Sequence, residues 1–560
     1  MLNPNANSSV GIKTGEPKLK IGLIVNSESL PQHLFELAQW CQNQSALTIS
    51  HLLVIDTAYA KRHTLSENLR SSCLSVITWL ESLLLKKAGI HLSNACHSLN
   101  KLIPESIKIE TATDASGSIF SCAESELNKI AALQLDVLLM VGNGTLQGGI
   151  LNVAKYGVIS PCYSDQNVAC ARPEGFWEVF LKLDYTGFAV CELGGTHSGN
   201  ELVSGRIRTQ YYYLLNRLHI RQKCLHYLKV TLESIAHNRM MPSSTSPIPS
   251  AARMHGMPSL SVQARYATAL GLRLIGRVLR SRLNMDFKWN VAFKKTGWKS
   301  LAMETAVKIP NPKNHFLADP FVVSEGGRDY CFLEDYDYST AKGHIAVYQL
   351  HDDHAECLGN ALIEPYHLSF PYMFRYKSEL YMCPETSRNR QIRVYKCVSF
   401  PLQWQLHTIL MDDVSAADSM LFEYNDRWWM LTNMDVAENG DFCTELSIYW
   451  ADSPLSSDWT AHPANPVFID AAKGRNAGLL FDAEHIYRVA QKQSFDFYGK
   501  AFSINRIDQL DENNYSETEV RSVQADFFPN IHGTHHMHSN GKATVFDFIS
   551  KRSSRFKQSA

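Results

Sequence analysis

The sequence predicts two folded parts of different class: an α/β domain with a mostly parallel sheet, followed by a five-bladed β-propeller. In the first part, apolar runs of strand length alternate with stretches of helical periodicity. In the second part, one hairpin pattern recurs five times at a spacing of roughly 50 residues, as propeller blades do. A chain of 560 residues is long enough to hold both domains.

Composition narrows the class of protein. Hydrophobic residues make up 45% of the chain, charged residues 19%, and the formal net charge is −1, which argues against a disordered or nucleic-acid-binding protein. The polar opening lacks the apolar core of a secretory signal, and no apolar run reaches the roughly 18 residues of a membrane span. The 13 cysteines are scattered and contain no C-x-x-C pair. Together these features predict a cytoplasmic protein with reduced thiols.

The α/β elements follow one another in a regular order. Strands are expected at 20–25, 52–55, 107–110 and 135–140, and helices at 31–41, 66–87 and 123–133. We assign residues 1–18 to a disordered tail, 19–235 to the α/β domain, 236–286 to a linker with a helix, 287–550 to the propeller and 551–560 to a second tail. Ligands of such sheets bind beyond the carboxyl ends of the strands.

A glycine-rich loop follows the strand at 135–140. The loop begins Gly142-Asn143-Gly144, but the third glycine comes one residue too late for a dinucleotide-binding G-x-G-x-x-G. A tight strand-to-helix turn is therefore favoured over a phosphate-binding loop.

Several motifs after this loop occur in the order typical of a known family. They are Gly142-Asn143-Gly144, Tyr156-Gly157-Val158-Ile159, Arg172-Pro173-Glu174-Gly175, Tyr185-Thr186-Gly187 and Gly199-Asn200-Glu201. In this order they resemble the formyltransferases that use 10-formyltetrahydrofolate, which include methionyl-tRNA and amino-sugar formyltransferases. The resemblance covers roughly residues 19–235 and implies a Rossmann-like, formyltransferase-type sheet.

The residues that carry formyl transfer in that family have changed. The family uses an Asn to stabilise the oxyanion, a His as general base and an Asp that tunes the His. The matching positions are Ser160, Cys162 and His197. The resemblance therefore implies a degenerate domain that no longer transfers formyl groups. An altered but active formyltransferase remains an alternative, as does a new nucleophile–base pair of Cys162 and His197.

Between the domains, residues 237–261 are rich in Pro and Ser and read as a linker. Residues 262–283 then predict a helix in which arginines alternate with apolar residues. Such a helix either lies on an anionic membrane surface or packs its apolar stripe onto its own domain.

The propeller pattern brings carboxylates together. The innermost strand of each blade lines the central channel, so the residues that precede the five strands should meet at one mouth. These residues are Asp319, Phe370, Asp418, Asn476 and His535, while Glu334 and Glu385 end the second strands of two blades. Paired carboxylates serve as base or nucleophile and as acid in glycoside chemistry. An Asp before Pro is also a good turn former, and that reading of Asp319 stays open. Glu445 is a weaker candidate.

A second resemblance covers about residues 287–550. Ala318-Asp319-Pro320-Phe321, Lys342-Gly343-His344-Ile345 and Pro384-Glu385-Thr386-Ser387 resemble the N-terminal propeller of plant glucosamine inositolphosphorylceramide transferases. Five-bladed furanosidase-type glycosidases have a similar fold, with a first-blade Asp as general base, a role that analogy gives to Asp319. Lys492 departs from the pattern, which usually has an Asp after Arg-x-Ala-Gln. We expect catalytic roles for Asp319, Glu334, Glu385 and Asp418, and substrate binding by Arg475, Asn476, Arg488, Gln491 and His535.

A histidine cluster also marks the last blade: His532, His535, His536 and His538. On a strand these side chains point to different faces, so a metal site is not favoured. The leading hypothesis is a carbohydrate-active enzyme of surface-glycan or glycoconjugate biosynthesis, a glycosyltransferase or a glycosidase-like enzyme, acting on a sugar nucleotide or glycan. The alternatives are an N-formyltransferase for an amino-sugar nucleotide, with 10-formyltetrahydrofolate, and a non-catalytic glycan-binding scaffold. Oligomeric state stays open, and the protein is expected in the cytoplasm, with a possible peripheral contact at the inner face of the membrane.

Overall fold

The computed structural model describes residues 17–56, 65–90, 95–103, 105–113, 119–142, 144–163, 173–194, 199–243, 246–247, 256–282 and 287–551. The chain divides into two compact units, Met1–Ala269 and Leu270–Ala560. The division falls inside a helix, α6 (Leu260–Arg282), and not at the predicted borders of the linker.

The first unit is built on a mixed sheet of ten strands in the order β12-β11-β10-β9-β7-β1-β3-β5-β6-β8. The five neighbours β5-β3-β1-β7-β9 are parallel, whereas β10, β11 and β12 extend the sheet antiparallel. The expectation of a mostly parallel sheet therefore holds for the centre and is wrong for this flank, where β10 and β11 pair as antiparallel neighbours. The strands are β1 (Leu19–Val25), β3 (Leu47–Asp56), β5 (Ser106–Thr113), β6 (Ile119–Cys122), β7 (Val137–Met140), β8 (Thr145–Gln147), β9 (Val158–Cys162), β10 (Tyr185–Leu193), β11 (Gly199–Arg208) and β12 (Ser246–Pro247), with β2 (Ser29–Pro31) and β4 (Cys96–Ser98) as a separate pair.

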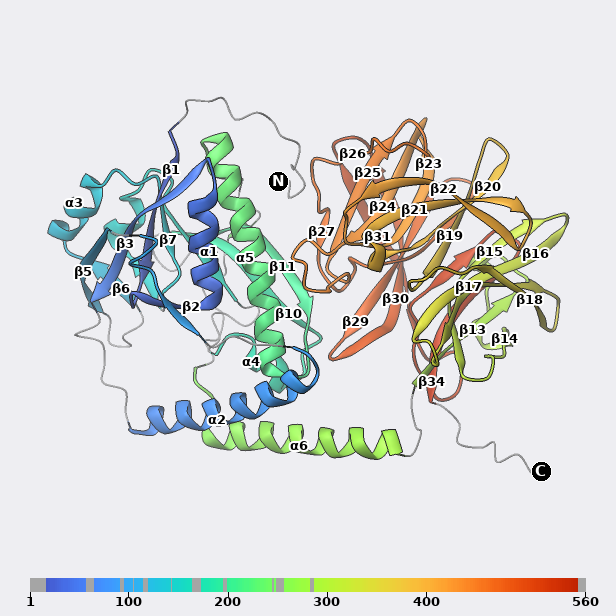
Figure 1. Ribbon diagram of the computed structural model, residues 1–560, viewed down its shortest axis with the longest axis horizontal. Helices are drawn as coiled ribbons and strands as arrows, with labels where there is room; N and C mark the ends of the chain where they lie inside the picture. Colours follow the sequence, from blue (N-terminus) through green and yellow to red (C-terminus); the bar gives the residue numbers. More distant parts are fainter. Residues whose placement is uncertain are drawn as a thin grey trace. The chain divides into compact units, whose positions relative to one another are not determined.

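The helices of this unit are α1 (Gln32–Asn43), α2 (Leu65–Lys87), α3 (Glu124–Ala132), α4 (Phe176–Leu181) and α5 (Tyr213–Asn238). The three helices predicted from periodicity begin and end within two residues of these bounds. Helices α1 and α5 both contact the sheet and each other (Figure 1). The central strands are buried on both faces, as the consecutive buried residues Leu23, Ile24 and Val25 of β1 show, which explains their continuous apolar runs.

The region predicted as linker and helix has structure of its own. Within 236–286, β12 pairs with the edge strand β11, and α6 begins two residues before the predicted start. Tyr266 and Gln263 of α6 are buried, and the Gln263 side-chain amide donates to the backbone carbonyl of Arg70 on α2 at 2.9 Å. The helix thus packs its first turns on the first unit.

The second unit is a five-bladed β-propeller, as predicted. Four blades follow one another along the chain: β15–β18, β19–β22, β23–β27 and β28–β31. The innermost strands β15, β19, β23, β28 and β33 contact one another in a closed ring. The strands of these four blades are β15 (His315–Glu325), β16 (Arg328–Asp337), β17 (Lys342–Leu350), β18 (Ala355–Leu362), β19 (Ser369–Tyr376), β20 (Glu379–Glu385), β21 (Gln391–Ser399), β22 (Gln403–Asp412), β23 (Ala416–Tyr424), β24 (Arg427–Met434), β25 (Glu445–Ala451), β26 (Thr460–Ala461), β27 (Phe468–Ile469), β28 (Asn476–Phe481), β29 (Ile486–Ser494), β30 (Phe497–Leu510) and β31 (Tyr515–Gln524).

The fifth blade combines strands from both ends of the domain. Strands β32 (Ile531–Gly533) and β33 (Met537–Ser539) both pair with β34 (Thr544–Lys551). Strand β34 pairs in turn with β13 (Phe287–Lys294), which pairs with β14 (Val307–Ile309). Phe287 lies opposite Lys551 and Lys294 lies opposite Thr544. This pairing closes the ring, so no inner strand is left with an open edge.

Candidate active site

Three of the innermost strands share an unusual backbone feature. In β15, β19 and β23, the pairing with the second strand skips two residues, and the first skipped residue is Asp319, Phe370 or Asp418. All three have positive φ angles, at 48°, 45° and 50°. Residues other than glycine rarely adopt this conformation, which costs free energy. The repeated bulge therefore turns the same position of each blade out of the regular strand alternation.

The residues before and opposite this bulge are also equivalent from blade to blade. Ala318 pairs with Glu334, and Ser369 pairs with Glu385, so both predicted glutamates occupy one position of the hairpin. In the fourth blade the skipped residues are Ala477 and Gly478, and Asn476 lies one residue earlier. The prediction that Asn476 is equivalent to Asp319 is therefore wrong by one residue.

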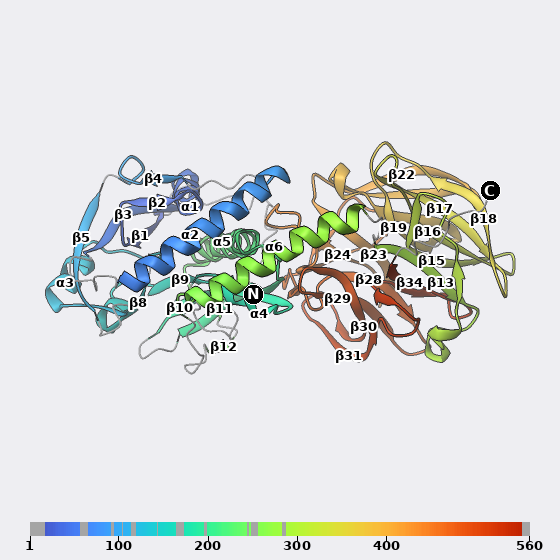
Figure 2. The same cartoon turned by 90° about the horizontal axis from the view of Figure 1, so that it is seen from below.

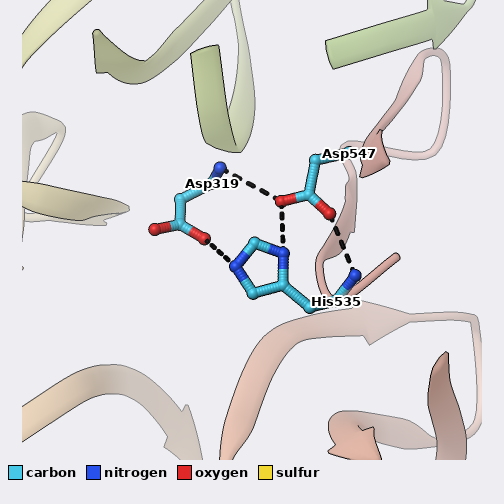
Figure 3. A group of neighbouring side chains, drawn as sticks. All are labelled: Asp319, His535 and Asp547. Atoms are coloured by element: carbon cyan, nitrogen blue, oxygen red, sulfur yellow. Dashed lines mark hydrogen bonds and ion pairs between the residues drawn. The ribbon is translucent and has the colours of Figure 1, made fainter. Parts of the chain in front are cut away.

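The centre of the site is a chain of three buried side chains, Asp547, His535 and Asp319 (Figure 3). His535 Nδ1 lies 2.7 Å from Asp547 Oδ2, and His535 Nε2 lies 3.3 Å from Asp319 Oδ1. The Asp319 backbone N–H also donates to Asp547 Oδ2 at 3.3 Å. Asp547 comes from β34, His535 from the break between β32 and β33, and Asp319 from the bulge of β15. The first blade and the last hairpin of the propeller thus converge on one proton-sharing group.

Both oxygens of the Asp547 carboxylate are already occupied by neighbouring groups. Its Oδ1 accepts the backbone N–H groups of His535 at 3.0 Å and of His536 at 3.1 Å. Its Oδ2 already faces His535 Nδ1 and the Asp319 N–H. One ligand atom from each of Asp319, His535 and Asp547 would lie within 4.8 Å of the others, close enough for a metal ion. Because the Asp547 oxygens are occupied, the group suits the sharing of a proton better than metal coordination.

The aromatic surroundings of His535 fix the plane of its ring. The Trp289 indole stacks on it with ring centroids 4.0 Å apart, and the Tyr498 ring meets it edge-on at 5.2 Å. A neutral imidazole that is oriented by a carboxylate on Nδ1 presents Nε2 toward its other neighbour. Asp547 and Trp289 therefore act together to aim His535 Nε2 at Asp319.

Burial changes the ionisation of this group. Burial raises the pKa of Asp319 to about 6, with the His535 ring opposing that increase. Burial lowers the pKa of His535, but the Asp547 and Asp319 carboxylates outweigh it and raise that pKa above its usual value. Near neutral pH, Asp319 is thus close to its midpoint, as a general base or acid should be.

Glu334 is the second buried carboxyl group of the first blade. Burial, reinforced by the charges of Asp319 and Glu385, raises its pKa well above the usual range. His367 Nε2 lies 3.6 Å from Glu334 Oε1, and its Nδ1 accepts the Gly343 N–H at 2.8 Å. Burial thus favours the protonated form of Glu334, next to the Asp319 carboxyl group.

Arg475 joins the remaining two predicted carboxylates. Its Nε donates to Asp418 Oδ2 at 2.7 Å, and a terminal nitrogen lies 3.6 Å from Glu385 Oε2. Its guanidinium also lies over the Tyr498 ring at 5.2 Å. Burial raises the pKa of Asp418, and the Arg475 charge opposes that increase. The arrangement brings all four predicted carboxylates into one electrostatic group, with Arg475 as their cation.

Three residues predicted to bind substrate instead hold the fourth blade together. Arg488 is fully buried and forms a two-point ion pair with Glu517, at 2.8 and 2.6 Å. The Asn476 amide donates to the backbone carbonyls of Asp418 and Leu431, and Gln491 donates to the Asn476 carbonyl at 3.0 Å. Their polar atoms are used inside the blade, which gives these residues a structural role. The substrate-binding role of Asn476, Arg488 and Gln491 stays a prediction.

The other histidines and Glu445 lie beside the site. His538 Nδ1 accepts the Val322 N–H at 3.2 Å, and His536 is fully buried against the Phe321 ring. Burial lowers the pKa of both rings, that of His538 to about 4. Glu445 is fully buried in β25.

Asp547 was missed by the sequence analysis, although it stands on the second strand of its hairpin, as Glu334 and Glu385 do.

In the first unit, two of the three former formyltransferase positions, Ser160 and Cys162, lie among the described residues. The Ser160 hydroxyl donates to the backbone carbonyl of Met140 at 3.1 Å, and Cys162 ends strand β9. His197 lies outside the described residues, so the pairing of Cys162 with His197 stays a hypothesis.

Residues 287–551 thus form a five-bladed propeller with a buried, carboxylate-rich mouth. Residues 299–535 match the family described as glucosamine inositolphosphorylceramide transferase 1, N-terminal. Proteins named glucosamine inositolphosphorylceramide transferase 1 are similar, with 36% identity over 212 residues in Oryza sativa subsp. japonica and 34% over 218 residues in Arabidopsis thaliana.

Both alignments cover 37% of this chain but only 28% and 27% of the relatives, so the chain spans little more than a quarter of their length. The resemblance of the propeller to this family is confirmed, whereas these matches give no support to the formyltransferase resemblance. Two solved structures are also similar. The family 117 glycoside hydrolase Zg3597 of Zobellia galactanivorans has 12% identity, a TM-score of 0.30, and coverage of 47% of this chain and 90% of that one. The Coprinopsis cinerea GH62 α-L-arabinofuranosidase catalytic domain has 10% identity, a TM-score of 0.35, and coverage of 48% and 98%.

Proposed function

We propose that the propeller is a carbohydrate-active enzyme domain of glycoconjugate biosynthesis, which binds a glycosyl substrate at its mouth. The observation that carries this proposal is the Asp547–His535–Asp319 chain, with Asp319 buried and its pKa raised to about 6. The similarity of residues 299–535 to proteins named glucosamine inositolphosphorylceramide transferase 1 supports an amino-sugar or inositol-containing glycoconjugate as the substrate class.

The proposed chemistry divides two proton transfers between two carboxyl groups. Asp319 accepts the proton of an attacking hydroxyl group, and the positive charge that His535 can carry stabilises the ionised form of Asp319. Glu334, whose pKa burial raises well above its usual range, donates a proton to the oxygen that leaves the sugar carbon. Arg475 holds Asp418 and Glu385 in place and offsets their charge, so a polar ring can bind without meeting uncompensated anions.

The test is turnover of the full chain on a panel of sugar nucleotides and oligosaccharides. Asp319→Asn should reduce the rate by at least about 100-fold, because it removes the base without changing shape. Asp413→Asn is the matched control, since Asp413 is an exposed aspartate with a similar φ of 52°. Saturable glycan binding with no turnover by the wild type would indicate the scaffold alternative. Turnover that survives Asp319→Asn would remove Asp319 as the base.

A second proposal concerns the first unit. Asn26, Gly142 and Cys162 stand at the carboxyl ends of β1, β7 and β9, three adjacent parallel strands, where sheets of this kind bind ligands. A Cβ on Gly142 would lie 2.5 Å from Asn26 Oδ1, so any side chain there would displace the Asn26 amide. We propose that this edge retains a ligand site with altered formyltransferase residues. Calorimetry with 10-formyltetrahydrofolate tests it, and absence of any heat of binding would exclude the folate form of the proposal.

A further inference from the structure

Helix α2 presents a row of large apolar side chains to solvent. Leu69, Val76, Trp79, Leu80 and Leu83 are between 42% and 58% exposed. At about 100° per residue they fall within an arc of about 100° on the helix, and the span from Leu69 to Leu83 is about 21 Å long. Single exposed apolar residues are normal on a protein surface, but a contiguous row of this kind marks an interaction site. We call these five residues the α2 ridge.

The opposite face of α2 is fixed to the first unit, so the ridge cannot simply turn inward. Leu74, Ile77 and Leu85 are buried on that face, together with Glu81. The Glu81 carboxylate accepts the Leu214 N–H at the start of α5 at 2.9 Å and the hydroxyl group of Tyr266 on α6. Glu81 thus locks α2 against two other helices. The ridge is the outward face of an anchored helix.

Helix α6 has the same character. Leu260 is 41% exposed at its start, and Leu272, Ile275 and Leu279 are 52% to 65% exposed further along. The Gln263 amide joins the first turns of α6 to the backbone of α2, and Figure 1 and Figure 2 both draw these turns beside α2. The later turns of α6 belong to the second unit and give that unit an apolar stripe of its own.

Among the described side chains of α2 and of the first turns of α6, the exposed charges are all positive. Lys86 and Lys87 are exposed in the last turn of α2, and Arg265 is exposed on α6. Among the described side chains of the two helices, the only carboxylate is Glu81, which is buried. The sequence of α6 contains five arginines and no acidic residue. The surface is therefore complementary to an anionic apolar partner, and two copies face to face would oppose like charges.

We propose that the α2 ridge, with the first turns of α6, docks on the surface of a bilayer that contains anionic lipid. The aliphatic residues and Trp79 enter the boundary between headgroups and acyl chains, and the lysines and arginines meet the phosphates. Aromatic residues such as Trp79 prefer this depth. None of the described helices is long and apolar enough to cross a membrane, so the contact is a surface one. This inference does not depend on the sugar chemistry of the propeller.

The experiment is co-sedimentation of the full chain with phosphatidylcholine vesicles, with and without about one third phosphatidylglycerol. The wild type should bind the anionic vesicles, and added salt should weaken that binding. The ridge variant carries Val76→Gln, Trp79→Gln and Leu83→Gln, because glutamine keeps helix propensity. The partition coefficient of this variant should be lower than that of the wild type by about 10-fold or more. The control carries Ile363→Gln, Val398→Gln and Val520→Gln, which remove three equally exposed apolar side chains from the propeller and should change nothing.

Charge reversal separates the two contributions. Lys86→Glu with Lys87→Glu should lower binding to anionic vesicles on the order of 10-fold and leave any binding to neutral vesicles unchanged. No vesicle binding by the wild type, or equal binding by the ridge variant, would overturn the proposal. A wild-type dimer that becomes a monomer in the ridge variant, without vesicle binding, would identify the ridge as a contact between copies and would overturn it as well.

Discussion

Asp319→Asn should make the propeller more stable at neutral pH while it abolishes turnover. Burial raises the pKa of Asp319 from 3.8 to about 6 in the folded protein. Between these values the folded state holds a proton that the unfolded state has released, so wild-type stability falls as the pH rises through this window. At about 1.36 kcal/mol per pKa unit, the full cost above about pH 6 is ~3 kcal/mol. An amide of the same shape does not bear this cost, and Asn tolerates the positive φ.

The assay is urea unfolding of the full chain, monitored by its tryptophan fluorescence. The gain of Asp319→Asn over the wild type should be near zero at about pH 4 and should approach ~3 kcal/mol at about pH 8. Asp413→Asn should change the free energy of unfolding by less than about 0.5 kcal/mol at either pH, because its ion pair with Arg390 is exposed. A loss of stability in Asp319→Asn at about pH 8, or a gain that does not depend on pH, would refute the reasoning.

Three further predictions follow from the same geometry. Turnover should rise with pH through about 6 as Asp319 ionises, measured as a pH–rate profile of kcat/KM, and a flat profile would argue against Asp319 as base. Arg488→Met should destabilise the protein by about 3–5 kcal/mol, because it leaves the Glu517 carboxylate buried without its partner; Arg488→Met combined with Glu517→Leu should recover part of the loss in urea unfolding. Gly343→Ala should cost about 1–3 kcal/mol, since a Cβ there would lie 2.8 Å from Glu334 Oε1 and would collide with a backbone carbonyl; an unchanged melting temperature would contradict it.

The blades could be predicted from the sequence because each depends on local information. The alternation of apolar residues and the turn between two strands lie within about 20 residues. The same locality explains why Asp319, Asp418, Glu334 and Glu385 could be named as one group. Each occupies a position of the hairpin that the repeat itself reveals.

The remaining features depend on register and on pairing over long distances. Asn476 was placed one residue out because the bulge of the fourth blade begins at Ala477, and sequence alone does not show where a strand skips residues. Asp547 was missed because the last hairpin pairs with β13 from the start of the domain. Arg488 resembles a ligand-binding residue in sequence, and only the position of Glu517 shows that its charge is already neutralised inside the blade.

The closure of the ring ties assembly of the candidate site to the last strand of the propeller. Strand β34 emerges from the ribosome after every other strand of the propeller, and it carries Asp547. Until it pairs with β13, the His535 ring lacks the carboxylate that orients it, and the first and fourth blades have no partner to complete the ring. A chain that stops before Thr544 would thus lack the proton relay as well as the last blade. Completion of the ring and assembly of the site are one event, so an unfinished or clipped propeller would also lack the candidate site.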